Sequence, residues 1–215
     1  KKLKNDLAKE FINEKISVEL GMQCGEPNLK NAIDNLRKNK CDRIIVLPLY
    51  PQYASSSYGS AVEDVLKETL YNWNIPFLQI IPPFFSNPLF IETWANIGLS
   101  YINKKPDHVL FSFHGLPIRH LKKSDYSGKW CKKNHSCCEE LVEENRYCYS
   151  AQCYQTAKLI ANKLKLKKNK WSVSFQSRLG RDRWIQPYTE KKIEELAERG
   201  FKRIVVFCPS FVADC

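Results

Sequence analysis

The chain has 215 residues, of which 43% are hydrophobic, so it can bury a substantial core and is not a disordered protein. Its formal net charge is +11, but its lysines fall mainly on expected helix faces and turns, and no recognised nucleic-acid module is present. We therefore expect no nucleic-acid partner; the basic surface suits an anionic small molecule or peripheral contact with a membrane face. The longest apolar runs, such as 44–49, are strand-sized, so no transmembrane helix is expected.

Apolar spacing along the first half of the chain predicts helices that alternate with strands. Phe90, Trp94 and Ile97 recur at spacings of four and three residues, which places them on one broad helix face. The predicted elements are helices at 3–11, 28–38, 62–69 and 88–103 and strands at 44–47 and 77–81.

The second half repeats this alternation and predicts parallel sheets covered by helices on both faces. We therefore expect an α/β fold with two domains: residues 1–87 belong to the first, 88–106 form a bridging helix, and 107–215 belong to the second. A cysteine-rich insert at 120–149 interrupts the second domain. The predicted elements are strands at 108–113, 171–175 and 203–207 and helices at 150–165 and 189–199.

A histidine follows the most apolar predicted strand. His114 comes directly after the strand at 108–113 and precedes the Gly-Leu-Pro loop at 115–117. Ligands in open α/β sheets bind beyond the carboxyl ends of the strands, so His114 is expected at a binding site. The alternative, a loop histidine bonded to a backbone carbonyl, is disfavoured because a glycine and a proline fix the turn. We expect the other two histidines considered, His108 and His120, at the surface or as caps.

The other strand ends carry aromatic and proline residues with few formal charges. Because the carboxyl ends of parallel strands meet at one edge of a sheet, we expect these segments to line one cleft. Such walls suit a large, flat, apolar ligand better than a nucleotide, and the sequence contains no Gly-rich phosphate-binding loop. The segments are 48–53, 82–85, 114–115, 176–178 and 208–210.

Four motifs resemble, in order and in composition, those of ferrochelatase, the enzyme that inserts ferrous iron into a porphyrin at the end of haem synthesis. The resemblance covers essentially the whole chain. The motifs are LPLYPQYASSSYGS at 47–60, SFHGLP at 112–117, FQSRLGRDRWIQPYT at 175–189 and CPSFVAD at 208–214.

The resemblance implies a chelatase-like fold of two similar Rossmann-like domains, with parallel sheets flanked by helices and the porphyrin held between the domains. It implies a lyase that inserts Fe²⁺ into protoporphyrin IX or coproporphyrin III in haem biosynthesis, and we expect this enzyme in the cytoplasm. The alternatives are a chelatase for another tetrapyrrole or another metal such as cobalt, and a non-enzymatic iron–sulfur protein. The expected partners are the porphyrin and ferrous iron, and the sequence indicates no particular oligomeric state.

The resemblance also implies roles for individual residues. His114 matches a histidine that binds iron or removes pyrrole protons, Tyr50 a tyrosine near the metal, and Trp184 an aromatic wall of the pocket. Tyr53 and Ser57 share the motif of Tyr50 and are expected to bind the substrate. Iron insertion releases two pyrrole protons, so a base that is neutral near pH 7 is needed, and histidine, with an unperturbed pKa of about 6.5, suits that task.

Three features depart from the family pattern. The family's second key residue, a glutamate after the Ala213-Asp214 pair, is expected beyond Cys215, and an amino-terminal strand region is expected before Lys1. Gln23-Cys24 stands where many relatives have an Arg-Tyr pair, so we assign no iron-entry role to that loop.

Five of the nine cysteines lie between Cys131 and Cys153, in a polar segment without apolar periodicity. Such a segment needs a cross-link in order to fold, and ligation of a metal by thiolates would supply one. Some bacterial ferrochelatases carry a [2Fe–2S] cluster on cysteines within the chain, and this insert resembles that version. The preferred ligands are Cys131, Cys137, Cys138 and Cys148, with Cys153 as the alternate.

Two other interpretations of the cysteine-rich insert stay open, a zinc site with four cysteines and a set of free thiols. In either metal site, His135 is an alternative ligand to one of the cysteines.

Overall fold

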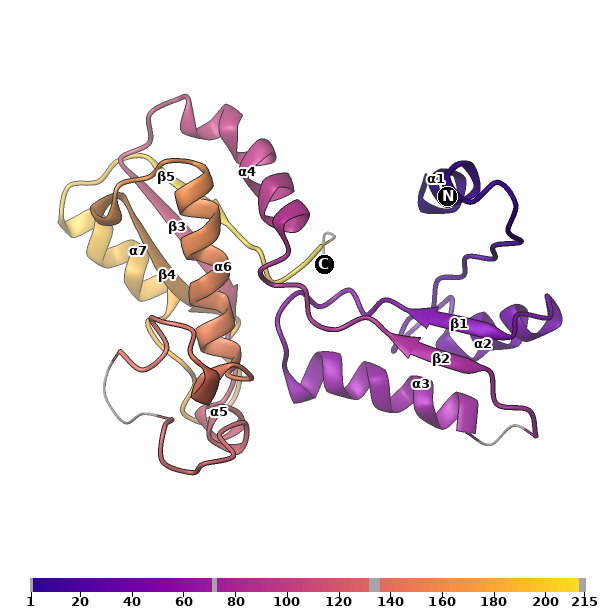
Figure 1. Ribbon diagram of the computed structural model, residues 1–215. Helices are drawn as coiled ribbons and strands as arrows, with labels where there is room; N and C mark the ends of the chain where they lie inside the picture. Colours follow the sequence, from indigo (N-terminus) through magenta and orange to yellow (C-terminus); the bar gives the residue numbers. More distant parts are fainter. Residues whose placement is uncertain (1, 71–72, 132–135, 213–215) are drawn as a thin grey trace. The chain divides into compact units, whose positions relative to one another are not determined.

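The computed structural model describes residues 2–70, 73–131 and 136–212 (Figure 1). The chain forms two compact units. Unit 1 comprises Lys1–Pro48 and Ser56–Pro82, and unit 2 comprises Leu49–Ser55 and Pro83–Cys215. The domain boundaries expected after residues 87 and 106 stay a prediction.

Unit 1 contains two parallel strands and the helices that precede and connect them. β1 (Arg43–Val46) pairs with β2 (Phe77–Ile80) in parallel register. α2 (Leu29–Lys38) begins at Asn28, whose side-chain oxygen accepts a hydrogen bond of 2.8 Å from the Asn31 amide. The remaining elements are α1 (Lys2–Glu10), the π-helical turn η1 (Ser55–Gly59), whose first residue belongs to unit 2, and α3 (Ser60–Leu70).

Unit 2 is built on a three-stranded parallel sheet with β3 (His108–His114) in the middle. β3 pairs with β4 (Trp171–Gln176) on one side and with β5 (Ile204–Phe207) on the other. Phe111 and Phe113 lie in the core that α6 covers, whereas Ser112 reaches the opposite face, where α7 begins. Helices thus cover both faces (Figure 1), and this explains why β3 is apolar almost throughout.

Four helices surround this sheet. α4 approaches β5 closely at Gly98, where a Cβ atom would lie 2.6 Å from Cε1 of Phe207, so only glycine fits without a shift. The helices are α4 (Pro88–Ile102), α5 (Ile118–Lys123), α6 (Tyr149–Lys163) and α7 (Thr189–Glu198), joined by the 3₁₀ turns η2 (Glu143–Asn145) and η3 (Lys168–Lys170). The predicted α/β class, with parallel sheets flanked by helices, is confirmed. Within the described ranges, every helix is too short or too polar to span a bilayer.

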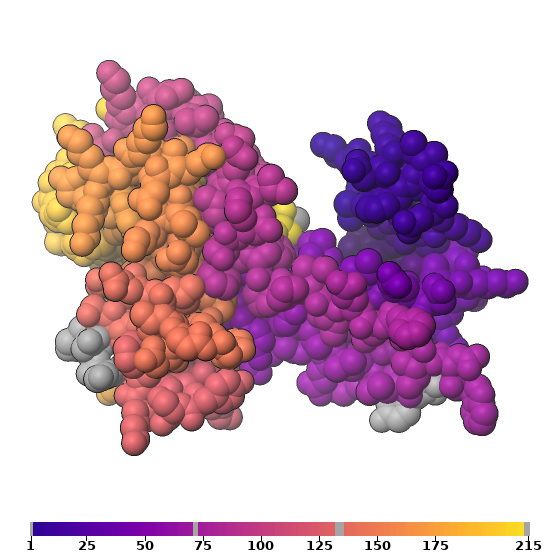
Figure 2. All heavy atoms as spheres, viewed as in Figure 1, coloured from indigo at the N-terminus to yellow at the C-terminus, as the bar shows by residue number. Residues whose placement is uncertain are grey.

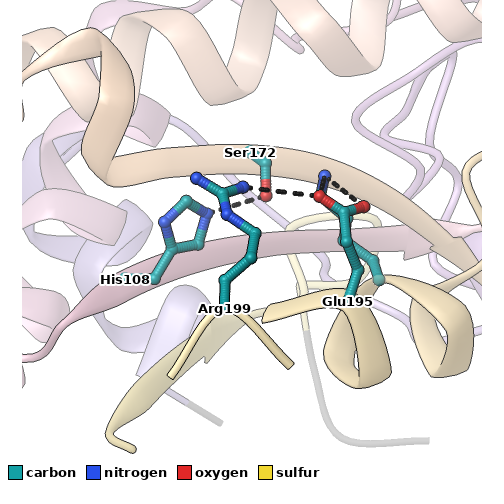
Figure 3. Close-up of polar contacts among 5 residues, drawn as sticks. His108, Ser172, Glu195 and Arg199 are labelled. Atoms are coloured by element: carbon teal, nitrogen blue, oxygen red, sulfur yellow. Dashed lines mark hydrogen bonds and ion pairs between the residues drawn. The ribbon is translucent and has the colours of Figure 1, made fainter. Parts of the chain in front are cut away.

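His108 lies inside unit 2, so the expectation of a surface histidine was wrong. Its side chain is 4% exposed, and its Nε2 lies 2.8 Å from the Ser172 hydroxyl (Figure 3). Its ring stacks on Phe201, with centroids 5.5 Å apart. The other ring nitrogen, Nδ1, is buried without a hydrogen-bond partner among the described residues. His108 is therefore a structural residue at the start of β3.

Charged side chains of α7, of its C-cap residue Arg199 and of η3 face this histidine; Figure 3 shows two of them, Glu195 and Arg199. Burial lowers the pKa of His108 most, and the positive charges of Lys192, Arg199 and Lys170 lower it further, against an opposing effect of Glu195. The folded protein therefore favours the neutral imidazole.

This lowered pKa predicts a loss of stability in acid. The unfolded chain takes up a proton at His108 as the pH falls through about 6.5, whereas the folded chain resists protonation until a lower pH. The free energy of unfolding should therefore fall as the pH falls below about 6.5, and His108→Gln should reduce this dependence. Denaturant unfolding of the wild-type protein and of His108→Gln, from about pH 5 to about pH 8, measures this pH dependence on both sides of about 6.5. Equal pH dependence in the two proteins would exclude His108 as the cause.

Candidate active site

The backbone of His114 is fixed by two side-chain hydroxyls. His114 ends β3 opposite Gln176, the last residue of β4. Its N–H donates to Oγ of Ser210 at 3.0 Å, and its carbonyl oxygen accepts from the Tyr149 hydroxyl at 2.8 Å. The Tyr149 and Ser210 hydroxyls lie 3.1 Å apart. The position of His114 at a strand end is thus as the sequence predicts. Ser210, from the expected cleft segment 208–210, and Tyr149, which the sequence did not single out, hold it there.

The imidazole of His114 is half-buried. It meets the ring of Phe211 edge-on, with centroids 5.9 Å apart. Burial lowers the pKa of His114 below its ordinary value. The side chain is therefore neutral near pH 7, with a lone pair on one ring nitrogen that can accept a proton or bind a metal ion.

Trp184 packs next to the turn that follows His114. The Gly115 amide donates to the Gln176 carbonyl at 2.7 Å. A Cβ atom on Gly115 would lie 2.8 Å from that oxygen and 3.1 Å from Cε3 of Trp184, so glycine lets the indole approach the backbone. Trp184 is half-buried, and its Nε1 is buried with no partner within the described part of the chain.

The loop that carries Tyr50 and Tyr53 is anchored to α6. Gln52 is buried, and its amide donates to the Thr156 hydroxyl and to the Pro209 carbonyl, both at 3.2 Å. The Tyr53 amide donates to Oε1 of Gln152 at 2.6 Å. Tyr50 and Tyr53 are half-buried. The loop thus contacts Pro209, which adjoins the Ser210 that binds His114.

Ser57, the remaining residue expected to bind substrate, lies in η1 of unit 1 and is half-buried. Its binding role stays a prediction, as do those of Tyr50, Tyr53 and Trp184.

The four preferred cysteines of the insert line one cavity. The walls of this cavity include Cys131, Cys137, Cys138 and Cys148. The Cys138 sulfur lies 3.6 Å from that of Cys137 and 3.8 Å from that of Cys148. Cys153, the alternate ligand, is wholly buried in the core and is not among the lining residues. His135 lies outside the described residues. Figure 2 shows the described part of the insert, in salmon, packed next to the orange residues of α6.

Two polar side chains organise the insert in place of an apolar core. The Asp125 carboxylate accepts hydrogen bonds from the Trp130 and Cys131 amides at 2.7 and 2.6 Å. Together with the Ser127 hydroxyl, these bonds lower the pKa of Asp125 to about 2. The Asn145 amide donates to two backbone carbonyls, those of Cys137 and Glu140, each at 2.8 Å. These hydrogen bonds fix the backbone at two of the cysteines, Cys131 and Cys137.

The spacing of the sulfur atoms fits two thiolates that share a metal. Two ligands on one tetrahedral ion with bonds of about 2.3 Å lie about 3.8 Å apart. The contact with Cys138 lowers the pKa of Cys148, as do the amides of Ala151 and Ser150, and it raises the pKa of Cys138. In the described part of the chain, no three His, Cys, Asp or Glu side chains converge on a point that could hold a single metal ion. Among the described residues, Cys138 is thus the cysteine whose sulfur lies within 3.8 Å of two others, those of Cys137 and Cys148.

The sequence is similar throughout its length to one group of known proteins. The family model described as ferrochelatase matches residues 1–215. Ferrochelatase of Pseudomonas entomophila (strain L48) is 44% identical over 200 residues, which cover 92% of this chain and 59% of that protein. Ferrochelatase of Azotobacter vinelandii is 42% identical over 199 residues, with the same shares. Ferrochelatase of Coxiella burnetii (strain RSA 493) is 40% identical over 207 residues, which cover 96% of this chain and 57% of that protein. The chain thus spans less than two thirds of the length of these relatives.

Proposed function

Because this chain belongs to the ferrochelatase family, we propose that the full-length protein is a lyase that inserts Fe²⁺ into a porphyrin, protoporphyrin IX or coproporphyrin III, in haem biosynthesis. The observation that carries this proposal is the neutral, half-buried imidazole of His114 at the end of β3, with both polar atoms of its backbone held by hydrogen bonds. A chelatase for cobalt or another tetrapyrrole is not favoured, since the similar proteins named above are ferrochelatases.

In this reaction, Fe²⁺ replaces two protons on the pyrrole nitrogens, and both protons leave the porphyrin. The neutral His114 imidazole accepts one of them, or binds the incoming iron through the same lone pair. Tyr50, on a loop anchored to α6, is proposed to lie near the metal. Trp184 is proposed to offer the flat face of its indole to the macrocycle, and Tyr53 and Ser57 to bind the substrate.

The cysteine cavity is proposed to hold a [2Fe–2S] cluster through Cys131, Cys137, Cys138 and Cys148. The two sulfur–sulfur distances of 3.6 and 3.8 Å support this ligand set. A bound cluster would supply one-electron redox chemistry and a covalent cross-link for the polar insert. The iron insertion step needs no redox chemistry, because it changes no oxidation state.

The proposed location is the cytoplasm, and the basic surface, with a formal charge of +11, suits peripheral contact with an anionic membrane face. No nucleic-acid partner is proposed.

Porphyrin binding tests the proposed substrate class. In the full-length protein, Trp184→Ala should weaken porphyrin binding about tenfold, because the aromatic contact that it removes contributes about 1.5 kcal/mol. Trp184→Phe should recover most of the affinity, since a flat ring remains. Titration of the metal-free porphyrin with each variant, followed by porphyrin fluorescence, measures the two affinities. A wild-type protein that does not bind porphyrin would reject the proposal, and an unchanged affinity in Trp184→Ala would reject the role of Trp184.

A further inference from the structure

His114 lies at a place where the β-ladder no longer provides a partner on one side. β3 and β5 pair from His108 opposite Ile204 to Phe111 opposite Phe207, and this pairing ends there. Three residues later, the N–H and C=O of His114 need other partners, because buried peptide groups are costly when unpaired. Ser210 and Tyr149 supply them at 3.0 and 2.8 Å.

The two hydroxyls act as a pair. They lie 3.1 Å apart, and each contacts the other as well as one polar atom of the His114 backbone. Tyr149 is 7% exposed and Ser210 is also 7% exposed, so solvent does not readily replace either bond. Tyr149 is the first residue of α6 and directly follows Cys148, which lines the cysteine cavity.

We propose that Tyr149, acting with Ser210, is a positioning residue that fixes the His114 peptide and thereby orients its imidazole. This inference rests on the proposed function, since it assigns to Tyr149 a part in the work of His114. The Tyr149 hydrogen bond also connects the cysteine cavity to His114. Cys148 and Tyr149 are consecutive, so a displacement of Cys148 displaces the residue that holds the His114 carbonyl.

The first test separates orientation from substrate binding. Tyr149→Phe keeps the buried ring and removes only the hydroxyl, so kcat for iron insertion by the full-length protein should fall about tenfold, while the KM for porphyrin changes less than about twofold. Ser210→Ala should have a similar effect. The double variant should lose little more than the worse single variant, because the two hydroxyls depend on each other.

Tyr154→Phe is the matched control. Tyr154 lies on the same helix, and its ring packs on Phe175 with centroids 6.3 Å apart. The Tyr154→Phe variant should keep the wild-type kcat. A Tyr149→Phe variant with the wild-type kcat would overturn the proposal, and Ser210→Ala decides the matter if Tyr149→Phe does not fold.

A second readout does not depend on activity. With ¹³C-labelled histidine, the His114 ring signal of the full-length protein should shift or broaden in Tyr149→Phe, whereas the His108 signal should stay in place. An unchanged His114 signal would overturn the proposal even if kcat falls. If the wild-type protein inserts no iron but the His114 signal still responds to Tyr149→Phe, then the proposed function fails and the positioning contact stands.

Discussion

Replacing His114 with alanine should lower the rate of iron insertion at least about a hundredfold, the usual loss when a positioned acid–base group is removed. The reason is the neutral imidazole at the end of β3, whose pKa burial lowers, so that it is ready to accept a pyrrole proton or to bind iron near pH 7. The fold should stay intact, because the bonds that hold His114 come from its backbone rather than its ring. Steady-state iron insertion by the full-length variant, with far-ultraviolet circular dichroism as the check on folding, measures this.

His120→Ala is the control for this experiment, since it removes another imidazole from unit 2, on α5, and should leave turnover unchanged. A His114→Ala protein that keeps near wild-type turnover would show that the role assigned to His114 is wrong.

Replacing Cys148 with serine should remove the colour of the protein. Purified without oxygen, the wild-type protein should be brown, with about two irons and two acid-labile sulfides per chain, as expected for one [2Fe–2S] cluster. Cys148 is the N-cap residue of α6 and lies 3.8 Å from Cys138 by sulfur–sulfur distance, so its replacement should remove a proposed ligand and loosen the polar insert. Visible absorption measures the loss of colour, metal analysis the loss of iron, and proteolysis the loosening of the insert.

The matched control is Cys153→Ala, because Cys153 is buried in the core away from the cavity and should leave the cluster in place. Bleaching by Cys153→Ala, with colour retained in Cys148→Ser, would reverse the ligand assignment. Colourless wild-type protein with one zinc would instead support the zinc site, and wild-type protein without metal would leave free thiols.

The sequence predicted most of unit 2 because its signals are local. A strand covered by helices on both faces is expected to be apolar along most of its length, and β3 shows that pattern between Val109 and Phe113, apart from Ser112. The position of His114 followed from the same strand and the turn after it. α1 marks the limit of periodicity, since its apolar spacing predicts a helix, yet none of its residues is buried. A pattern within a helix identifies a face without identifying what covers that face.

The contacts that sequence reasoning missed join distant residues. The Tyr149 hydroxyl reaches the His114 carbonyl across 35 positions, and Gln152 reaches the Tyr53 amide across 99. Neither residue breaks the pattern of an ordinary helix start, so no local signal could identify them. His108 was expected at the surface or as a cap, whereas its bond to Ser172 and its stacking on Phe201 make burial tolerable. In the insert, the hydrogen-bonding roles of Asp125 and Asn145 likewise became visible only in three dimensions.

The product formed by the full-length protein tests the central claim most directly. Under anaerobic conditions, the protein is mixed with excess Fe²⁺ and either protoporphyrin IX or coproporphyrin III, and the iron porphyrin is followed by its absorption spectrum. We predict many turnovers per protein molecule with at least one of the two porphyrins, and their loss in His114→Ala. Failure to form an iron porphyrin from either substrate, or insertion of cobalt without insertion of iron, would contradict the assignment.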